Sequence, residues 1–331
     1  MEKSCSFIEK ALRYAERHAH FRLCLVAGAA LLGWTGDWHW IPELFSHAFF
    51  QYALLSAALT LLLFFRRPGY WRWIALAATL AIWAPILPSW LPAGGIQDKP
   101  QGRLTLLQFN VFCYALPYNA TPVTEWISQR AREIDVVLLL EADTAFSASI
   151  QTLAREFPYR IERLSDDSPW GIALLSRYPF SEAHAVDLLD LDDLVMLDAR
   201  ITTPSGPVRV VGIHPPNPIS AGSTNLRDEF MDKLADYLNR DTRHPTVVFG
   251  DFNSTIWSPK LREFLSKTGL RDAQRGHGML STWPAPLAHY ADFLGVPIDM
   301  TLVSPGLSVE DRRAGPALGS DHLPVITRVA Y

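Results

Sequence analysis

Several polar residues in the last two-thirds of this 331-residue chain stand at the end of a short apolar run. Glu141 and His214 each follow directly on such a run, and Asp251 follows another after a single glycine. Carboxylate and amide oxygens are the ligands that Mg²⁺ and Mn²⁺ prefer, while histidines without the spacing of a zinc motif suit proton transfer. This combination predicts hydrolysis assisted by a divalent metal ion. The full set is Asn110, Glu141, His214, Asp251, Asn253, Asp299, Asp321 and His322.

Each of these residues has an ordinary structural explanation when it is considered alone. Asn110 could cap a turn through its own backbone, and Glu141 could simply mark where a buried strand reaches the surface. Either histidine could be a hydrogen-bonded core residue. Their repeated occurrence at the ends of apolar runs favours a shared site. The sequence contains no motif for two other kinds of chemistry, because it has neither a glycine-rich nucleotide loop nor a serine nucleophile elbow.

Short runs rich in Val, Leu and Ile must supply the scaffold that brings these residues together. Their lengths and flanking turn residues predict buried strands. Three stretches, residues 121–132, 225–240 and 258–268, have the apolar spacing of amphipathic helices. Strands outnumber helices and alternate with them irregularly, which predicts an α/β fold of two packed mixed sheets flanked by helices. The predicted strands are residues 104–109, 136–140, 171–175, 208–213, 246–249, 300–303 and 325–329.

Residues 104–331 resemble the endonuclease/exonuclease/phosphatase superfamily, which includes deoxyribonuclease-I-like nucleases, exonuclease-III-like repair enzymes, neutral sphingomyelinases and inositol-polyphosphate phosphatases. Each motif is weak alone, but their order and spacing over about 220 residues make the set specific. The resemblance implies a four-layer α/β sandwich with the site at one edge of the two sheets. The motifs are Gln-Phe-Asn110, Leu-Leu-Glu141, Ser176-Arg-Tyr-Pro179, His214-Pro-Pro-Asn217, Gly-Asp251-Phe-Asn253, Ser281-Thr-Trp-Pro284, Ile-Asp299 and Ser-Asp321-His322-Leu-Pro324.

The same resemblance implies roles for the residues around a metal ion. Glu141 would hold Mg²⁺ or Mn²⁺, with Asn110 and Asp321 beside it, and Asp251 would orient or deprotonate the attacking water. Phosphoester hydrolysis needs the charge on the phosphate oxygens neutralised and a water molecule held in line, and these residues would supply both. The sequence leaves open whether Asp251 or His322 is the general base.

The remaining residues are implied to contact the substrate. Asn253 and His214 would contact the phosphate, and His214 could also protonate the leaving oxygen. His322 would lie at the scissile phosphate, aligned by Asp299 as a carboxylate–imidazole pair. Two further residues are expected to contact the substrate, namely Asn217 and Trp283.

The first third of the chain differs from the rest because it carries long apolar segments. Residues 48–65 and 73–91 contain no charged side chain over 18 and 19 positions, and each is long enough to cross a hydrocarbon core of about 30 Å as a helix. A third segment, about residues 21–40, spans only if its helix continues past Asp37. We therefore predict an N-terminal bundle of about three transmembrane helices. The alternative for each segment is a buried helix in a soluble core.

Flanking charges predict how these segments are oriented. Lys and Arg precede the first segment and fill the link at residues 66–72, so the positive-inside rule places both in the cytoplasm. Three crossings would put the C-terminal domain on the non-cytoplasmic side of a bacterial inner membrane, whereas two would leave it in the cytoplasm. The predicted divisions are a membrane domain of residues 1–96, a linker of residues 97–103 and a metal-dependent phosphoesterase domain of residues 104–331.

Net charge bears on the substrate. Residues 101–331 carry 21 Lys and Arg against 28 Asp and Glu, so this part of the chain is acidic by about seven charges. Proteins that grip long nucleic acid usually present a basic surface instead. We therefore favour a lipid headgroup or another small phosphoester as substrate and the bilayer as partner. A membrane-tethered nuclease is the alternative, followed by a non-catalytic receptor or scaffold. The acidic stretch from Asp187 to Asp198 is interpreted as a solvated loop.

Overall fold

The computed structural model describes the whole chain except residues 1, 67–68, 92–99 and 113–119. The chain forms two compact units, Met1–Pro88 with Trp257–Pro259 and Ser89–Ile256 with Lys260–Tyr331. Of the predicted linker, residues 97–99 lie outside the described residues. The first strand begins at Arg103.

Helices make up the N-terminal unit. Two threonines link the helices Phe49–Arg66 and Trp71–Trp83, because the hydroxyl of Thr60 lies 2.8 Å from that of Thr79. The hydroxyl of Thr60 also lies within 3.2 Å of the carbonyl of Ala75, so polar groups as well as apolar ones hold this pair together. The elements are α1 (Glu2–Trp34), α2 (Trp40–Leu44), η1 (Phe45–Ala48), α3 (Phe49–Arg66) and α4 (Trp71–Trp83), and η2 (Leu87–Ser89) follows them.

Only one stretch of helix is long and apolar enough to cross a membrane among the residues that the structure describes. This stretch is Trp40–Phe65, which has 26 residues and contains the predicted segment 48–65. Its most apolar window of 18 residues has a mean hydropathy of 1.9. Length and composition alone do not distinguish a membrane span from the core helix of a water-soluble protein. Of the about three transmembrane helices that we expected, the described residues therefore contain one that is long enough to cross a membrane.

The other two predicted segments are interrupted. Within residues 73–91, α4 has only 13 residues and ends before Pro85, whose ring cannot continue a helix. At 1.5 Å per residue, α4 measures about 20 Å, short of a hydrocarbon core of about 30 Å. In the first segment α1 ends at Trp34, and a turn follows at Thr35 instead of a helix reaching residue 40.

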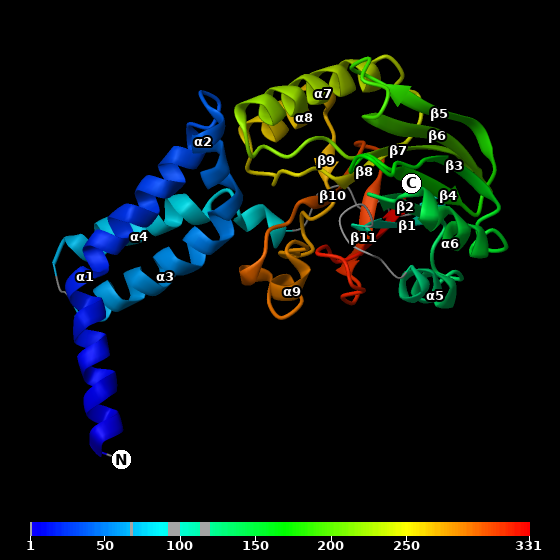
Figure 1. Cartoon of the computed structure of the whole chain (residues 1–331). Coiled ribbons are helices and arrows are strands. Elements are labelled where there is room, and N and C mark those ends of the chain that lie inside the picture. The colour runs from blue at the N-terminus through cyan, green and yellow to red at the C-terminus, as the bar shows by residue number, and fades with distance from the viewer. Residues whose placement is uncertain (1, 67–68, 92–99, 113–119) are drawn as a thin grey trace. The chain divides into compact units, whose positions relative to one another are not determined.

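Two six-stranded sheets form the C-terminal unit, within the part of the chain that the structure describes (Figure 1). One has the strand order β11-β12-β1-β2-β4-β3 and the other β5-β6-β7-β8-β10-β9. The pairs β1–β2 and β7–β8 are parallel and the other pairs are antiparallel, so both sheets are mixed. The strands are β1 (Arg103–Asn110), β2 (Val136–Leu140), β3 (Tyr159–Arg163), β4 (Ile172–Ser176), β5 (Phe180–Asp187), β6 (Val195–Thr203), β7 (Gly206–Ile213), β8 (Thr246–Asp251), β9 (Arg271–Asp272), β10 (Asp299–Val303), β11 (Ser308–Ala314) and β12 (Val325–Ala330).

Helices cover the outer face of each sheet. Leu138 and Leu174 of one sheet pack with Val210 and Phe249 of the other in a buried apolar core between them. The second face of the β1 sheet packs against the helices around Ile127, and the second face of the β8 sheet packs against the longer helices after β7 and β8. These four layers confirm the predicted α/β class. The helices are α5 (Thr121–Gln129), η3 (Thr144–Phe146), α6 (Ser147–Thr152), α7 (Ala221–Asn239), α8 (Pro259–Thr268), α9 (Ala285–Ala288) and η4 (Asp292–Leu294).

Strand register brings the polar strand ends to one edge. Because β1 and β2 are parallel and Asn110 pairs with Leu140, the side chain of Glu141 follows beside Asn110. In the other sheet β10 runs antiparallel to β8, so Asp299 at its start pairs with Asp251 at the end of β8. Gln108 links the two sheets by donating from Nε2 to the carbonyl of Gly250 at 3.0 Å.

The predicted acidic loop is partly wrong. Asp198 lies inside strand β6 and is buried, since its carboxylate accepts hydrogen bonds from Nε of Arg209 at 3.0 Å and from the hydroxyl of Tyr237 at 2.8 Å. A buried charge is tolerated where it is paired and hydrogen-bonded. Asp187 ends β5 and binds the backbone N–H groups of Leu189 and Asp192, which closes the turn.

Candidate functional site

The amide of Asn110 joins two carboxylates from different strands. Its Nδ2 donates to Oε1 of Glu141 at 2.9 Å and to Oδ2 of Asp251 at 3.1 Å. Its Oδ1 accepts from the backbone N–H of Phe112 at 3.1 Å. Asn110 is fully buried and thus braces the ends of β2 and β8 against each other.

Backbone conformation turns the two loops toward this point. Glu141 and Asn253 both have positive φ, at 54° and 49°, a left-handed conformation that ordinary residues adopt at a cost of about 1–3 kcal/mol. Gly250 has φ 146°, and a Cβ atom there would lie 2.0 Å from the carbonyl oxygen of Ile213. Only glycine fits where β8 approaches β7 so closely, which explains why Gly250 precedes Asp251 at the strand end.

His214 lies between the carboxylates and Asn253. Its Nε2 is 3.7 Å from Oε1 of Glu141, 3.6 Å from Oδ2 of Asp251 and 3.2 Å from Nδ2 of Asn253. Nδ1 lies 3.2 Å from the carbonyl of Pro169, which can only accept, so the hydrogen is placed on Nδ1 and Nε2 accepts from Asn253. Burial lowers the pKa of His214, which favours this neutral form.

The pKa of His322 is shifted in the direction opposite to that of His214. Its Nδ1 lies 2.9 Å from Oδ2 of Asp299, and its Nε2 faces Asp251 at 3.6 Å and Asp321 at 4.0 Å. Burial alone would lower the pKa of His322, but the carboxylates of Asp299 and Asp251 outweigh burial and raise it to about 10. Asp299 is fixed in turn by the hydroxyl of Thr282, which donates to the same oxygen at 2.5 Å. The imidazole is therefore a cation at neutral pH.

Two buried carboxylate oxygens at this edge lack a hydrogen bond. Oε2 of Glu141 and Oδ1 of Asp321 are buried and accept no hydrogen bond from any described residue. The other oxygen of Asp321 accepts from Nε1 of Trp283 at 3.0 Å. Buried oxygens of this kind cost free energy unless something binds them, and hard oxygen donors suit Mg²⁺ or Mn²⁺. The donor set therefore fits such an ion.

A second group of possible ligands is less suitable. One atom each of Asp251, Asp299 and His322 lie within 4.8 Å of one another. However, Nδ1 of His322 and Oδ2 of Asp299 lie 2.9 Å apart and already pair with each other. We therefore regard the free oxygens of Glu141 and Asp321 as the better donors. The amide oxygen of Asn110 is engaged by Phe112, so in this arrangement Asn110 orients Glu141.

Hydrogen bonds and ion pairs link nine of the ten predicted site residues to one another, and Asn217 is the tenth. Asn217 is exposed in the segment after β7, and none of the hydrogen bonds found within the described residues joins it to the others. Trp283 is partly exposed at the rim of the site. The sequence assigned no role to Thr282 or Ser320, although both belong to its motifs. Ser320 donates to the carbonyl of Asn110 at 2.7 Å and accepts from the N–H of His322 at 3.0 Å.

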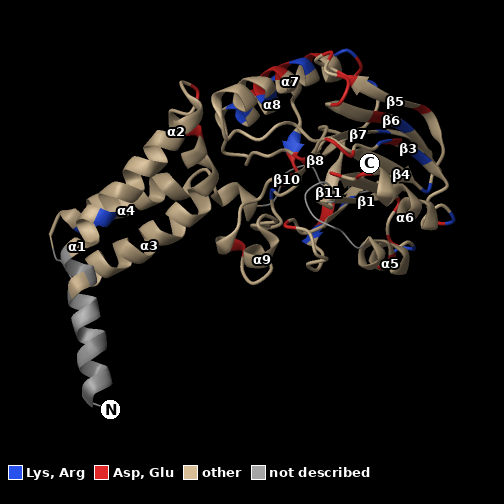
Figure 2. Cartoon of the chain, viewed as in Figure 1, with Lys and Arg blue, Asp and Glu red and all other residues tan. Residues whose placement is uncertain are grey.

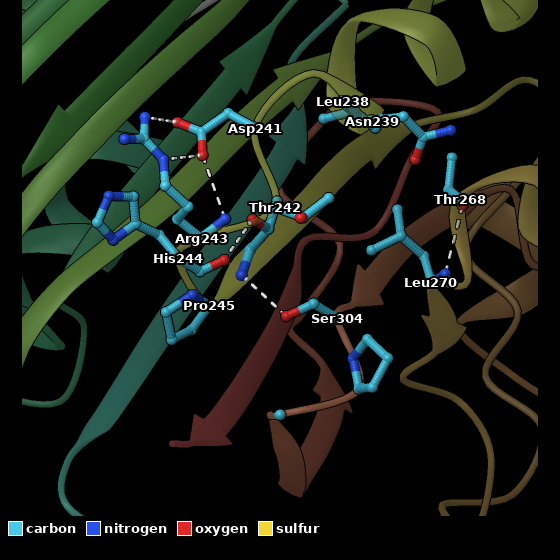
Figure 3. Close-up of a pocket in the computed structure, with 13 residues that line it drawn as sticks. Leu238, Asn239, Asp241, Thr242, Arg243, His244, Pro245, Thr268, Leu270 and Ser304 are labelled. Atoms are coloured by element: carbon cyan, nitrogen blue, oxygen red, sulfur yellow. Dashed lines mark hydrogen bonds and ion pairs between the residues drawn. The ribbon is translucent and has the colours of Figure 1, made fainter.

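A pocket of about 330 Å³ elsewhere in the unit is not this site (Figure 3). Thr246 at the start of β8 lines it, whereas Asp251 lies at the other end of the same strand. Its polar groups largely bind one another, as Arg243 does with Asp241 and the backbone N–H of Thr246 with Ser304. The polar cluster therefore remains the candidate site.

Comparison with known proteins agrees with this geometry. Residues 107–322, more than half of the chain, match the model of the endonuclease/exonuclease/phosphatase family. The chain belongs to this family. No curated protein matches it.

Solved structures with this fold include three bacterial or animal proteins. The endonuclease/exonuclease/phosphatase from Beutenbergia cavernae is 19% identical, with a TM-score of 0.58 over 70% of this chain and 72% of its own. A humanized TDP2 from D. rerio is 14% identical, with a TM-score of 0.55 over 69% and 98%. A beta toxin mutant from Staphylococcus aureus with bound magnesium ions is 20% identical, with a TM-score of 0.51 over 68% and 99%. At these identities the similarity establishes the fold alone.

Proposed function

We propose that this chain is a membrane-anchored phosphoester hydrolase that depends on Mg²⁺ or Mn²⁺. One observation carries the proposal: two buried carboxylate oxygens that accept no hydrogen bond, on Glu141 and Asp321, lie beside the buried ion pair of His322 and Asp299. This combination offers a site for a hard cation next to a fixed positive charge, which suits a phosphate group. Family membership supports the same class of reaction.

Glu141 and Asp321 would hold the metal ion, with Asn110 orienting Glu141. The bound ion would neutralise charge on the phosphate oxygens and on the leaving oxygen. Nε2 of His322 would donate a hydrogen bond to a further phosphate oxygen, since Nδ1 is already engaged by Asp299. Neutral His214 would hold Asn253, whose Nδ2 also donates to the carbonyl of Pro215 at 3.0 Å and thereby stays at the phosphate position.

Asp251 is the best candidate for the general base. Burial raises the pKa of Asp251 to about 6, close to neutrality, where a carboxylate can both exist as the anion and accept a proton. The backbone N–H of Asn253 holds its Oδ1 at 2.8 Å, which orients the group. His322 is unsuited to this task because it is already protonated at neutral pH.

The rest of the chain supports a proposal for the substrate and for the location. The acidic character of residues 101–331 disfavours a long nucleic acid and favours a lipid headgroup or another small phosphoester. The apolar helix Trp40–Phe65 would anchor the protein in a bacterial inner membrane. We place the catalytic unit on the non-cytoplasmic side, which an odd number of crossings from a cytoplasmic N-terminus would give.

A substrate panel tests this proposal. The full chain, purified in detergent, is incubated with Mg²⁺ and phospholipids, sugar and inositol phosphates, or single- and double-stranded nucleic acid. We expect hydrolysis of a lipid or small phosphoester that exceeds hydrolysis of nucleic acid. Preferential cleavage of nucleic acid would make the chain a tethered nuclease, and no turnover of any phosphoester would overturn the proposal.

A further inference from the structure

Residues 281–297 form a small lobe at the rim of the candidate site. This α9 lobe contains α9 and η4 and lies between β9 and β10 in sequence (Figure 1). The backbone N–H of Ala285 donates to the carbonyl of Asp321 at 2.6 Å, and the carbonyl of Thr282 accepts from the N–H of Leu323 at 3.0 Å. The lobe is therefore held directly against the loop that carries Asp321 and His322.

The α9 lobe has small residues inside and large apolar residues outside. Its interior cluster consists of Ala285 and Ala288 with Leu323. Among the described residues from 103 onward, eight large hydrophobic side chains are exposed, and five of them lie in this lobe: Trp283, Leu287, Tyr290, Phe293 and Leu294. The exposed fraction is 81% for Tyr290 and 50% for Phe293. Large apolar side chains clustered in water mark a surface that is covered in use.

Charge is almost absent from the α9 lobe. The segment from Trp283 to Pro297 contains no Lys or Arg and one carboxylate, Asp292. Oδ1 of Asp292 accepts from the backbone N–H of Ser281 at 3.1 Å, so this charge is used to close the lobe. Figure 2 shows the contrast with α7 and α8, which carry both acidic and basic residues. A protein interface would need a polar rim, whereas a lipid surface needs none.

We propose that the exposed face of the α9 lobe docks on the surface of a phospholipid bilayer. This inference rests on the proposed function and deepens it, because Trp283 connects the docking face to the site through its hydrogen bond to Asp321. Tyr and Trp side chains are suited to the headgroup level, where one end of the ring is wet and the other apolar. The site would then open toward the phosphates of the lipid headgroups. Since the unit is acidic, docking would depend on apolar contact and not on anionic lipid.

Fluorescence from a label at residue 290 tests this docking. The full chain, with Cys5, Cys24 and Cys113 replaced by Ser, receives the substitution Tyr290→Cys and an environment-sensitive label. A matched chain carries Ser128→Cys on the exposed face of α5. Both are reconstituted in phosphatidylcholine vesicles, with iodide on both sides of the membrane or with brominated acyl chains in the lipid. We expect the label at residue 290 to be quenched by brominated lipid and shielded several-fold from iodide relative to residue 128, in low and in high salt.

Two results would overturn the docking inference. In the first, iodide quenches both labels equally and brominated lipid quenches neither, which means that the α9 lobe faces water. In the second, residue 290 is shielded from iodide but brominated lipid does not quench it, which means that protein covers the lobe. Phosphoester hydrolysis is measured on the same labelled chain. Activity in a chain whose lobe is uncovered rejects docking and keeps the proposed function. A chain that docks but is inactive keeps docking and rejects the proposed function.

Discussion

Nδ1 of His322 lies 2.9 Å from Oδ2 of Asp299, and both side chains are almost completely buried. The two residues come from the loop before β12 and from the first position of β10, in different sheets. A buried carboxylate in this position keeps the imidazole protonated and fixes which nitrogen faces the site. The pair therefore couples the packing of the two sheets to the charge that we propose acts on the phosphate.

Replacing Asp299 should shift the pH dependence of activity. The pKa of His322 is raised to about 10, so the imidazolium persists up to that pH and is lost above it. Asp299→Asn removes the carboxylate that supports the cation, and we expect the alkaline limb of the pH–rate profile to move down by about 1–3 units. Thr282→Val is the control, because it removes a hydrogen bond to Asp299 and keeps the charge. An alkaline limb that stays in place in Asp299→Asn would show that His322 does not act as a cation.

Glu141→Gln should weaken metal binding while preserving the fold. The substitution keeps the shape of the side chain but replaces the buried oxygen that lacks a partner, Oε2, or its neighbour with an amide nitrogen. We expect Mg²⁺ affinity, measured by calorimetry, to fall by about 10-fold or more and activity by about 10²-fold or more. Glu125→Gln on the exposed face of α5 is the matched control. Unchanged calorimetric affinity in Glu141→Gln would exclude Glu141 as a ligand.

Gly250→Ala should destabilise the C-terminal unit. A methyl group at this position meets the carbonyl oxygen of Ile213 at 2.0 Å and also strains a backbone with φ 146°. We expect a loss of about 2 kcal/mol or more in the free energy of unfolding, seen as a lower melting temperature. Gly206→Ala separates the two effects, since Gly206 has φ 122° but no atom within 4 Å of its added Cβ. Equal losses in both variants would mean that the approach of β8 to β7 is not tight.

A reporter fused after Tyr331 should show on which side of the membrane the catalytic unit lies. We expect a phosphatase reporter that folds only outside the cytoplasm to be active in cells. Such activity requires an odd number of crossings before β1, and the helix Trp40–Phe65 can supply one. A reporter that functions only in the cytoplasm provides the matched fusion. If that second reporter alone is active, the catalytic unit is cytoplasmic.

The central strands were predictable because burial dictates their composition. β2 occupies the predicted residues 136–140, and all five of its residues are buried. Strands β3, β5 and β11 were not predicted, since they lie at or near sheet edges, are only partly buried and carry charged residues. β6 was missed for another reason: its buried Asp198 is neutralised by Arg209, a partner that lies on the next strand and cannot be recognised from local sequence.

Convergence of the site was predictable from strand ends, but its internal bonding was not. That Asn110 and Glu141 are neighbours follows from two parallel strands ending together. The hydrogen bond from Trp283 to Asp321 depends on how the α9 lobe folds back, which apolar patterning does not specify. Similarly, the absence of charge in residues 73–91 does not reveal where the helix ends. α4 ends before Pro85, which cannot continue a helix.

Hydrolysis measured with and without metal tests the central claim most directly. The full chain is freed of metal with a chelator and assayed on the best phosphoester from the substrate panel, before and after Mg²⁺ or Mn²⁺ is added. We expect no turnover in chelator, recovery with either ion, and a recovery in Glu141→Gln that is lower by about 10²-fold or more. Full turnover in chelator, or full recovery by Glu141→Gln, would contradict the central claim.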